Sequence, residues 1–250
     1  MLGATSPRVA VAITPAEYKN VGVSVPAGAA VPSGVMVRDE RGQRHALDAL
    51  ITRPTVLVLS DYRCKTLCGP VLDFVVTALE QSGLKAGSQF EVLVVGLDPR
   101  NTRDDVRVAR RQHISDDDDV DRATSFFTTD ESSILRLTKA LGYRYVYDAA
   151  ADQFVHPAAA FILRADRRIS RVLTGVGLSG PDMRLALVEA GQGKIGDLSD
   201  QIRLLCSAFD PTQGTYTPLI GRTLQIASTA TLILLAGGIG FLAFSNRRSA

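Results

Sequence analysis

Apolar and polar positions along the chain predict a series of short strands and amphipathic helices. Two stretches, 55–60 and 90–98, are almost continuously apolar and rich in β-branched residues, which is typical of strands buried on both faces of a sheet. Between them, residues 69–82 repeat apolar side chains at helical spacing. A strand, a helix and a strand in this order predict a parallel pair of strands joined by a crossover helix.

Neighbouring segments extend this alternation in both directions. We expect a hairpin at 35–47, a helix at 102–113, a strand near 126–129, a helix at 131–141, two strands within 155–173 and a helix at 179–190. This order predicts an α/β protein with a thioredoxin-like central sheet flanked by helices. We place the domain at residues 34–190, followed by a linker at 191–222.

The N-terminal segment has a different composition. Residues 1–33 combine prolines with alanine and glycine, so we expect an extended arm without a core of its own. Pro7 and Arg8 interrupt the apolar residues at the start, so the segment lacks the continuous apolar region of a secretory signal. Two explanations stay open, a signal region that was processed and an atypical start.

The C-terminal segment predicts a membrane anchor. Residues 224–244 carry no formal charge, and a helix of this length at about 1.5 Å per residue matches the roughly 30 Å hydrocarbon core of a bilayer. We therefore expect one transmembrane helix at 223–245. Because Arg247 and Arg248 outnumber Arg222 on the other side, the tail at 246–250 should be cytoplasmic. The domain would then face the periplasm or the outside of the cytoplasmic (inner) membrane.

Composition narrows the possible functions. The 28 Lys and Arg against 26 Asp and Glu give a net charge of +2, which offers no support for nucleic-acid binding or for a polybasic membrane patch. Three cysteines are too few for a small domain held together by disulfides. Two of them lie close in sequence and are better interpreted as a reactive or metal-binding pair.

Cys64 and Cys68 lie where the strand at 55–60 passes into the following helix. Ligands gather at such strand ends in α/β sheets, and a helix N-terminus favours a thiolate. If both cysteines occupy the first helical turn, their Cβ atoms lie roughly 5–6 Å apart, wider than the ~3.5–4.5 Å of a relaxed disulfide. Two thiolates on one soft ion, Cu(I) or zinc, fit that spacing, whereas a bridge requires local unwinding.

Several motifs make the chain resemble the Sco/SenC family of thioredoxin-like copper proteins, which serve the synthesis of cytochrome c oxidase. The resemblance covers residues 35–217 and rests on the cysteine segment 64–68, the strand end 95–99, the Val155-His156 pair with 161–166, and the segment 203–216. It implies one copper ion held by Cys64, Cys68 and His156. It also implies a partner, the copper-bearing subunit of cytochrome c oxidase or a respiratory complex.

The chain departs from the family pattern at three positions. The family usually has proline directly after each cysteine, where this chain has Lys65 and Gly69. The aspartate usual before the histidine is Val155 here, which removes a possible partner of the imidazole. A lysine beside a thiolate lowers its pKa, and losing proline loosens the loop. These changes concern metal affinity and redox potential and leave the ligand set in place.

Three functions follow from these residues. The first is a metallochaperone, not an enzyme, that delivers copper to the dinuclear copper site of the oxidase. The second is a thiol–disulfide reductase in which Cys64 and Cys68 are catalytic and no metal matters. The third is a structural accessory subunit of a respiratory complex.

We assign no role to His45 and His113. We expect Cys206 to pack as apolar surface, and we expect Asp98 to tune the site or cap a turn.

Overall fold

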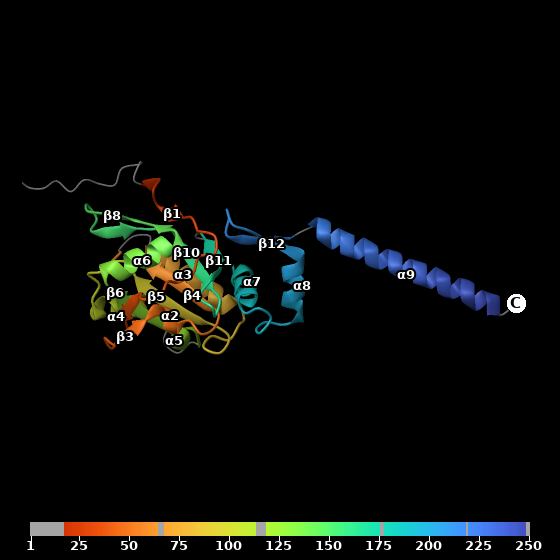
Figure 1. Cartoon of the computed structure of the whole chain (residues 1–250), viewed down its shortest axis with the longest axis horizontal. Coiled ribbons are helices and arrows are strands. Elements are labelled where there is room, and N and C mark those ends of the chain that lie inside the picture. Colours follow the sequence, from red (N-terminus) through yellow and green to blue (C-terminus); the bar gives the residue numbers. More distant parts are fainter. Residues whose placement is uncertain (1–17, 65–67, 114–118, 176–177, 219, 249–250) are drawn as a thin grey trace, which may run out of the picture.

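A mixed sheet lies at the centre of the fold, in a computed structural model that describes residues 18–64, 68–113, 119–175, 178–218 and 220–248 (Figure 1). Its seven strands lie in the order β11-β10-β4-β5-β6-β2-β3. Their bounds are β2 (Met36–Arg38), β3 (Arg44–Ala46), β4 (Thr55–Ser60), β5 (Glu91–Gly96), β6 (Thr124–Thr129), β10 (Ala159–Leu163) and β11 (Ile169–Thr174). Strands β4, β5 and β6 run parallel, and the remaining neighbours in this sheet pair antiparallel. The predicted parallel pair and hairpin are confirmed.

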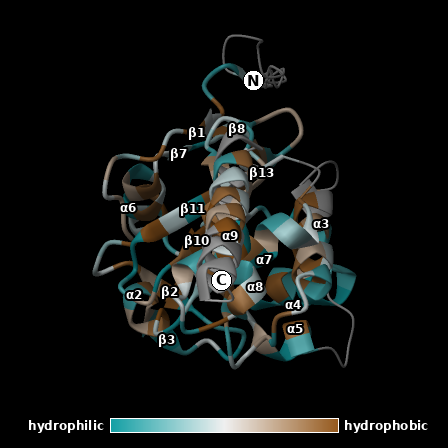
Figure 2. Cartoon of the chain, turned by 90° about the vertical axis from the view of Figure 1, so that its right-hand side faces the viewer, coloured by the Kyte–Doolittle hydropathy of each residue, from teal (hydrophilic) through white to brown (hydrophobic). Residues whose placement is uncertain are grey.

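Helices cover both faces of the sheet. They are α2 (Leu47–Leu50), α3 (Cys68–Gln81), α4 (Arg103–His113), α5 (Asp119–Ala123), α6 (Glu131–Leu141) and α7 (Gly180–Ala190). Helices α2 and α6 lie on one side of the strands and α3 and α4 on the other (Figure 2). Successive residues of β4 alternate between the two cores, because Val56 packs on the α3 side and Leu57 on the α6 side. Burial on both faces explains why these strands are continuously apolar in sequence.

Small elements surround the sheet. The short strands are β1 (Gly22–Val23) paired with β7 (Tyr143–Arg144), β8 (Val146–Asp148) paired with β9 (Gln153–Val155), and β12 (Ser207–Asp210) paired with β13 (Thr215–Pro218). Helix α8 (Leu198–Cys206) precedes β12, so the span expected to be a linker contains regular structure. Arg184 of α7 donates to the buried Asp200 of α8 at 2.6 Å. This pair attaches α8 to the domain.

The C-terminal helix differs from its sequence-based interpretation. Helix α9 (Ile220–Arg248) extends away from the domain (Figure 1). Across the described residues, no helix combines the length and the apolar character needed to cross a membrane. The expected transmembrane helix at 223–245 is therefore wrong, and so are the inner-membrane location and the opposite placement of domain and tail that depended on it. The expectation counted formal charges only, whereas α9 also carries polar residues such as Gln225, Ser228 and Thr231.

The turn after α6 leads to Tyr143, the first residue of β7, which belongs to the candidate metal centre. Gly142 ends the helix in the left-handed conformation with φ of 65°, and its carbonyl accepts from Ser24 N at 2.8 Å. A Cβ at this position would overlap the Ser24 carbonyl oxygen. We expect Gly142→Ala to lower the free energy of unfolding by more than the ~1–3 kcal/mol of backbone strain alone, measured by urea denaturation.

Gly28→Ala is the matched control for this substitution. Gly28 has a similar φ of 72°, and an added Cβ there meets no atom within 4 Å. It should show the backbone penalty without the overlap. Equal losses for the two variants would mean that the overlap with Ser24 adds nothing to the cost of the substitution.

Candidate metal centre

Cys64 lies at the carboxyl end of β4, in the turn that follows the strand. The turn is closed by Asp61, whose carbonyl accepts from Cys64 N at 3.2 Å and whose Oδ1 accepts from Arg63 N at 3.0 Å. Cys64 is half-buried and precedes α3, which begins at Cys68. Residues 65–67 and the side chain of Cys68 lie outside the described part of the structure, so the spacing of the two thiols stays a prediction.

His156 follows β9 and is half-buried. Its Nδ1 lies 2.9 Å from Tyr143 Oη and 3.2 Å from the Pro157 carbonyl oxygen. A carbonyl can only accept, so Nδ1 carries the hydrogen and Nε2 carries the lone pair. Burial lowers the pKa of His156 below its ordinary value of 6.5, against smaller opposing effects of Pro157, Cys64 and Asp61, and so favours the neutral ring.

The Nε2 atom of His156 is buried and has no hydrogen-bond partner among the described groups. A neutral imidazole with its lone pair free is the form that binds a metal. The other nitrogen is already fixed by Tyr143, which is the arrangement that orients metal-binding histidines. His156 is thus prepared for a ligand at Nε2.

The β8–β9 hairpin brings His156 toward Cys64. Cys64 Sγ lies 3.5 Å from Gln153 Oε1, three residues before His156, and Phe154 N donates to Asp61 Oδ2 at 2.8 Å. The charge of Cys64 also contributes to the pKa of His156. Asp61 therefore fixes the hairpin to the turn that carries Cys64, and this places the strand before His156 next to that turn.

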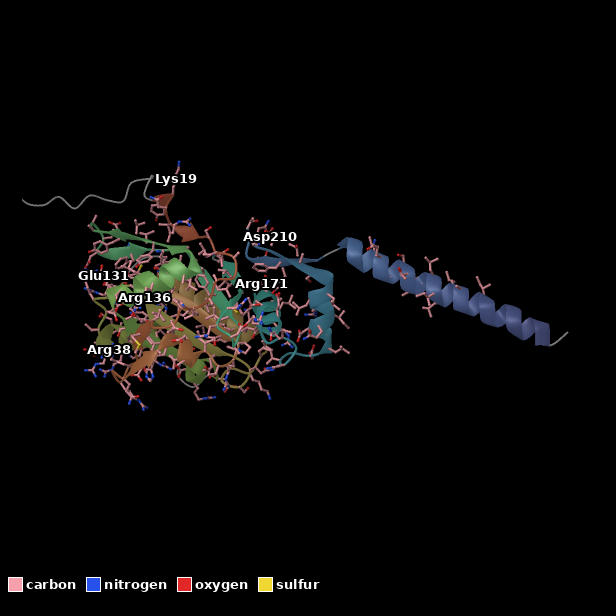
Figure 3. The ribbon with its side chains drawn as sticks, in the orientation of Figure 1. Lys19, Arg38, Glu131, Arg136, Arg171 and Asp210 are labelled. Carbon is pink, nitrogen blue, oxygen red and sulfur yellow. The ribbon has the colours of Figure 1, made fainter. Side chains whose placement is uncertain are left out.

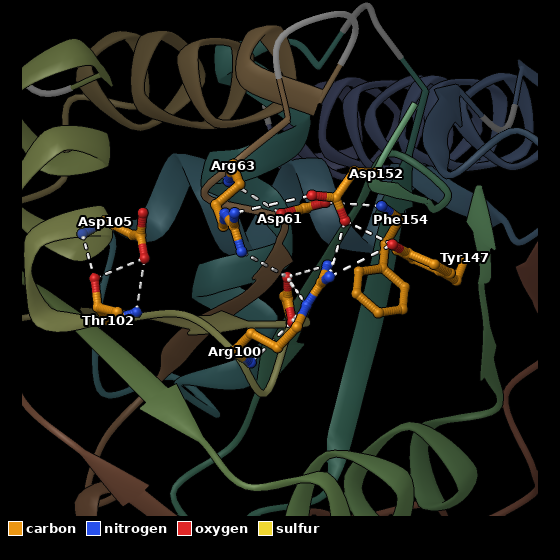
Figure 4. A network of polar contacts seen from close by, with 9 residues as sticks. Asp61, Arg63, Arg100, Thr102, Asp105, Tyr147, Asp152 and Phe154 are labelled. Atoms are coloured by element: carbon orange, nitrogen blue, oxygen red, sulfur yellow. Dashed lines mark hydrogen bonds and ion pairs between the residues drawn. The ribbon is translucent and has the colours of Figure 1, made fainter. Parts of the chain in front are cut away.

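An ion-pair network supports this arrangement on its outer side (Figure 4). Asp98, with only 2% of its side chain exposed, lies 2.8 Å from Arg100 Nη2 and 3.8 Å from Arg63 Nη1. Arg100 also pairs with Asp152 at 2.8 Å. The contacts of Asp98 and Asp152 raise the pKa of Arg100 above its usual range. The network connects the ends of β4 and β5 to the loop between β8 and β9, and Asp98 is its buried centre.

The described donors fit a soft metal only in part. Thiolate and imidazole are the ligands that Cu(I), Cu(II) and zinc accept. Among the described side chains, no group of three cysteine, histidine or carboxylate residues is placed to hold an ion. Cys64 and His156 supply two donors, and the third expected donor, Cys68, is outside that set.

The other cysteine and histidines lie elsewhere. His45 Nε2 lies 3.0 Å from Asp39 Oδ2, and His113 Nδ1 lies 2.8 Å from Asp73 Oδ1. Cys206 ends α8, and its side chain is not among those described.

Sequence reasoning missed Asp61, Arg100 and Asp152, because none belongs to a motif and each acts through a partner distant in sequence or across a loop.

Comparison with known proteins identifies the fold. No family model matches the sequence, and neither does any curated protein. Among solved structures, a protein of Aquifex aeolicus VF5 provisionally described as an electron transfer protein is 21% identical, with a TM-score of 0.58 over 67% of this chain and 94% of that one.

Two Sco proteins have the same fold. BsSco, described as a member of the Sco family of cytochrome c oxidase assembly proteins with a disulfide switch, is 16% identical, with a TM-score of 0.52 over 68% of this chain and 98% of that one. Copper-bound ScoI of Bradyrhizobium japonicum is 16% identical, with a TM-score of 0.51 over 66% and 99%. The resemblance to the Sco/SenC family is thereby confirmed at the level of the fold.

Proposed function

We propose that this chain binds one copper ion through Cys64, Cys68 and His156 and transfers it to a cytochrome c oxidase during assembly of the enzyme. The observation that carries the proposal is the buried, unpartnered Nε2 of His156 on the hairpin that contacts Cys64. An uncompensated polar atom in a protein interior costs free energy of roughly 1–3 kcal/mol. A metal at Nε2 removes that cost.

The chemistry of the donors favours copper over harder ions. Thiolate is a soft ligand, and one neutral imidazole beside it suits copper better than magnesium or calcium, which require oxygen ligands. The Sco proteins of the same fold include one crystallised with copper and one described as an oxidase assembly protein. Delivery to the dinuclear copper site of the oxidase is the finer part of this proposal.

Each described residue has a definite task in this function. Cys64 supplies a thiolate, and Arg63 beside it in the sequence pairs with Asp98 and Asp152 of the outer network. Asp61 holds the hairpin against the cysteine turn, and Tyr143 holds the imidazole through Nδ1. The half-buried position of Cys64 leaves one side of the site open to a partner protein.

Copper stoichiometry tests the proposal directly. The full chain, loaded with Cu(I) under reducing conditions and desalted, should retain one copper per chain by mass spectrometry. Cys64→Ser and Cys68→Ser should each retain less than about a tenth, because losing about 1.4 kcal/mol already costs tenfold in affinity and a thiolate–copper bond is worth more.

Cys206→Ser is the matched control for these two variants. It removes a thiol from α8, outside the proposed site, and should retain one copper per chain. Full copper retention by Cys64→Ser, or loss of copper in Cys206→Ser equal to that in Cys64→Ser, would refute the assignment.

A further inference from the structure

A polar cavity lies at the carboxyl edge of the sheet, apart from the metal centre. It encloses about 250 Å³ and is lined by residues of β2, β3 and β6 and of the loop after β5. Arg38, which lines it, lies at the end of the domain away from α9 (Figure 3). Neither Cys64 nor His156 takes part in its lining.

Two arginines lie side by side in the lining of this cavity. Arg38 of β2 and Arg44 of β3 are direct cross-strand partners, so their side chains leave the sheet on the same face. Both are exposed, and in the described part of the chain neither forms an ion pair with an acidic residue. Like charges placed directly opposite on a sheet destabilise it. An anion between them would remove that repulsion.

A buried amide completes the row. Arg38 is also the register partner of Thr128 on β6, and Asn101 follows the next strand, β5. Asn101 is only 8% exposed, and both its Nδ2 and its Oδ1 are buried without a hydrogen-bond partner among the described groups. A Cβ at Gly96 would lie 2.6 Å from Asn101 Oδ1, so glycine there makes room for the amide.

Asp130 is the acidic residue in the lining, and its oxygens are already engaged. Oδ1 accepts from Ser133 N at 2.8 Å as the N-cap of α6, and it also accepts from the Ser132 hydroxyl. These bonds lower the pKa of Asp130, so the group is charged near neutral pH. Two arginines against one carboxylate leave the cavity with a net positive charge.

We propose that this cavity binds a small oxyanion that carries a hydroxyl hydrogen, the chemistry shared by hydrogen phosphate and by hydroxycarboxylates. Arg38 and Arg44 offer paired N–H donors to the anionic oxygens, the arrangement in which arginine recognises carboxylate and phosphate. Asn101 Nδ2 donates to a further oxygen, and Asn101 Oδ1 accepts the hydroxyl hydrogen. This role is independent of copper binding.

Anion titration of the metal-free full chain tests the proposal. Phosphate and malate are the two oxyanion probes, sulfate is the probe without a hydroxyl hydrogen, and chloride at equal ionic strength is the blank. We expect one saturable site by calorimetry for phosphate, malate or both, with sulfate weaker. A dissociation constant of about 0.1 mM would stabilise the fold by roughly 2.7 kcal/mol at about 10 mM ligand.

The two oxyanion arms identify the source of the ligand. Binding of phosphate alone assigns a phosphate group, and binding of malate alone assigns a hydroxycarboxylate. If neither probe binds at about 10 mM, a hundredfold above the expected dissociation constant, the proposal is overturned. Sulfate that binds as tightly as phosphate overturns the part assigned to Asn101 Oδ1.

Arginine variants separate a site from a general salt effect. Arg38→Gln and Arg44→Gln should each weaken binding by about tenfold or more, because a charge-assisted hydrogen bond contributes roughly 1.5–3 kcal/mol. Without anion, both should be as stable as the parent or slightly more stable, since the facing charges are gone. Arg111→Gln, an exposed arginine on α4 outside the cavity, should bind like the parent. Equal stabilisation of all four proteins by phosphate would overturn the site.

Discussion

Replacing His156 by alanine is expected to abolish stoichiometric copper binding while Cys64 and Cys68 stay titratable as thiols. The variant loses His156 Nε2, the buried ring nitrogen that has no hydrogen-bond partner among the described groups. Mutating a residue that hydrogen-bonds to a metal ligand lowers metal affinity by about 10–100-fold. Removing the ligand itself should therefore lower copper affinity by more than about 100-fold. Copper per chain by mass spectrometry and thiols per denatured chain by a chromogenic reagent measure the two effects together.

His45→Ala and His113→Ala are the matched controls. Both histidines lie within hydrogen-bond distance of aspartates outside the metal centre, so each variant should keep one copper per chain. The His156 variant should fold, because the deletion also removes an unsatisfied buried nitrogen; far-ultraviolet circular dichroism checks this.

The variants His156→Ala, Cys64→Ser and Cys68→Ser together separate a copper carrier from a thiol–disulfide reductase. A reductase needs two cysteines and a suitable thiolate pKa, but it does not need an imidazole lone pair. If His156→Ala supports full oxidase maturation without added copper, while Cys64→Ser and Cys68→Ser do not, the carrier proposal fails and the reductase replaces it. If all three support maturation, the accessory-subunit hypothesis is left.

The sheet could be predicted because its strands have a strong sequence signal. β4 and β5 are buried on both faces, so nearly every residue is apolar, and α3 between them has one apolar face. The β8–β9 hairpin has no such signal, since its strands are three residues long and partly exposed. For α9 the sequence predicted a feature that is absent from the described residues, a membrane-spanning helix, because a segment without formal charges was equated with an apolar one.

The candidate site could be predicted only where a motif marks it. Cys64 and Cys68 lie close in sequence at a strand end, and His156 was found through the family resemblance rather than through its spacing. The contact of Asp61 with Phe154 spans 93 residues, so no local pattern reveals it. Because Val155 replaces the family aspartate, the sequence predicted an imidazole without that partner, yet Nδ1 donates to the hydroxyl oxygen of Tyr143 instead.

Tyr143→Phe should weaken copper binding by about 10–100-fold without removing any copper ligand. The hydroxyl oxygen accepts from His156 Nδ1 at 2.9 Å, and the hydroxyl donates to the Pro157 carbonyl at 3.0 Å. Phenylalanine keeps the ring, which packs in a tilted arrangement against Phe161 with centroids 5.9 Å apart. The loss of stability should therefore stay near the 1–3 kcal/mol of a buried hydrogen bond, and the fold should persist. Competition with a Cu(I) chelator of known affinity measures the copper effect.

Tyr147→Phe is the control, because its hydroxyl bonds Asp152 at 2.6 Å in the outer ion-pair network and does not contact His156. It should change copper affinity by less than about threefold, in line with the small contribution of exposed polar contacts. The ¹⁵N shifts of the His156 ring distinguish positioning from general loosening. In the parent, Nδ1 should be protonated and Nε2 bare, whereas Tyr143→Phe should show a mixture of both tautomers because only the weaker Pro157 contact remains. An unchanged tautomer together with weakened copper binding would mean that Tyr143 acts through packing, and an unchanged affinity would remove Tyr143 from the site altogether.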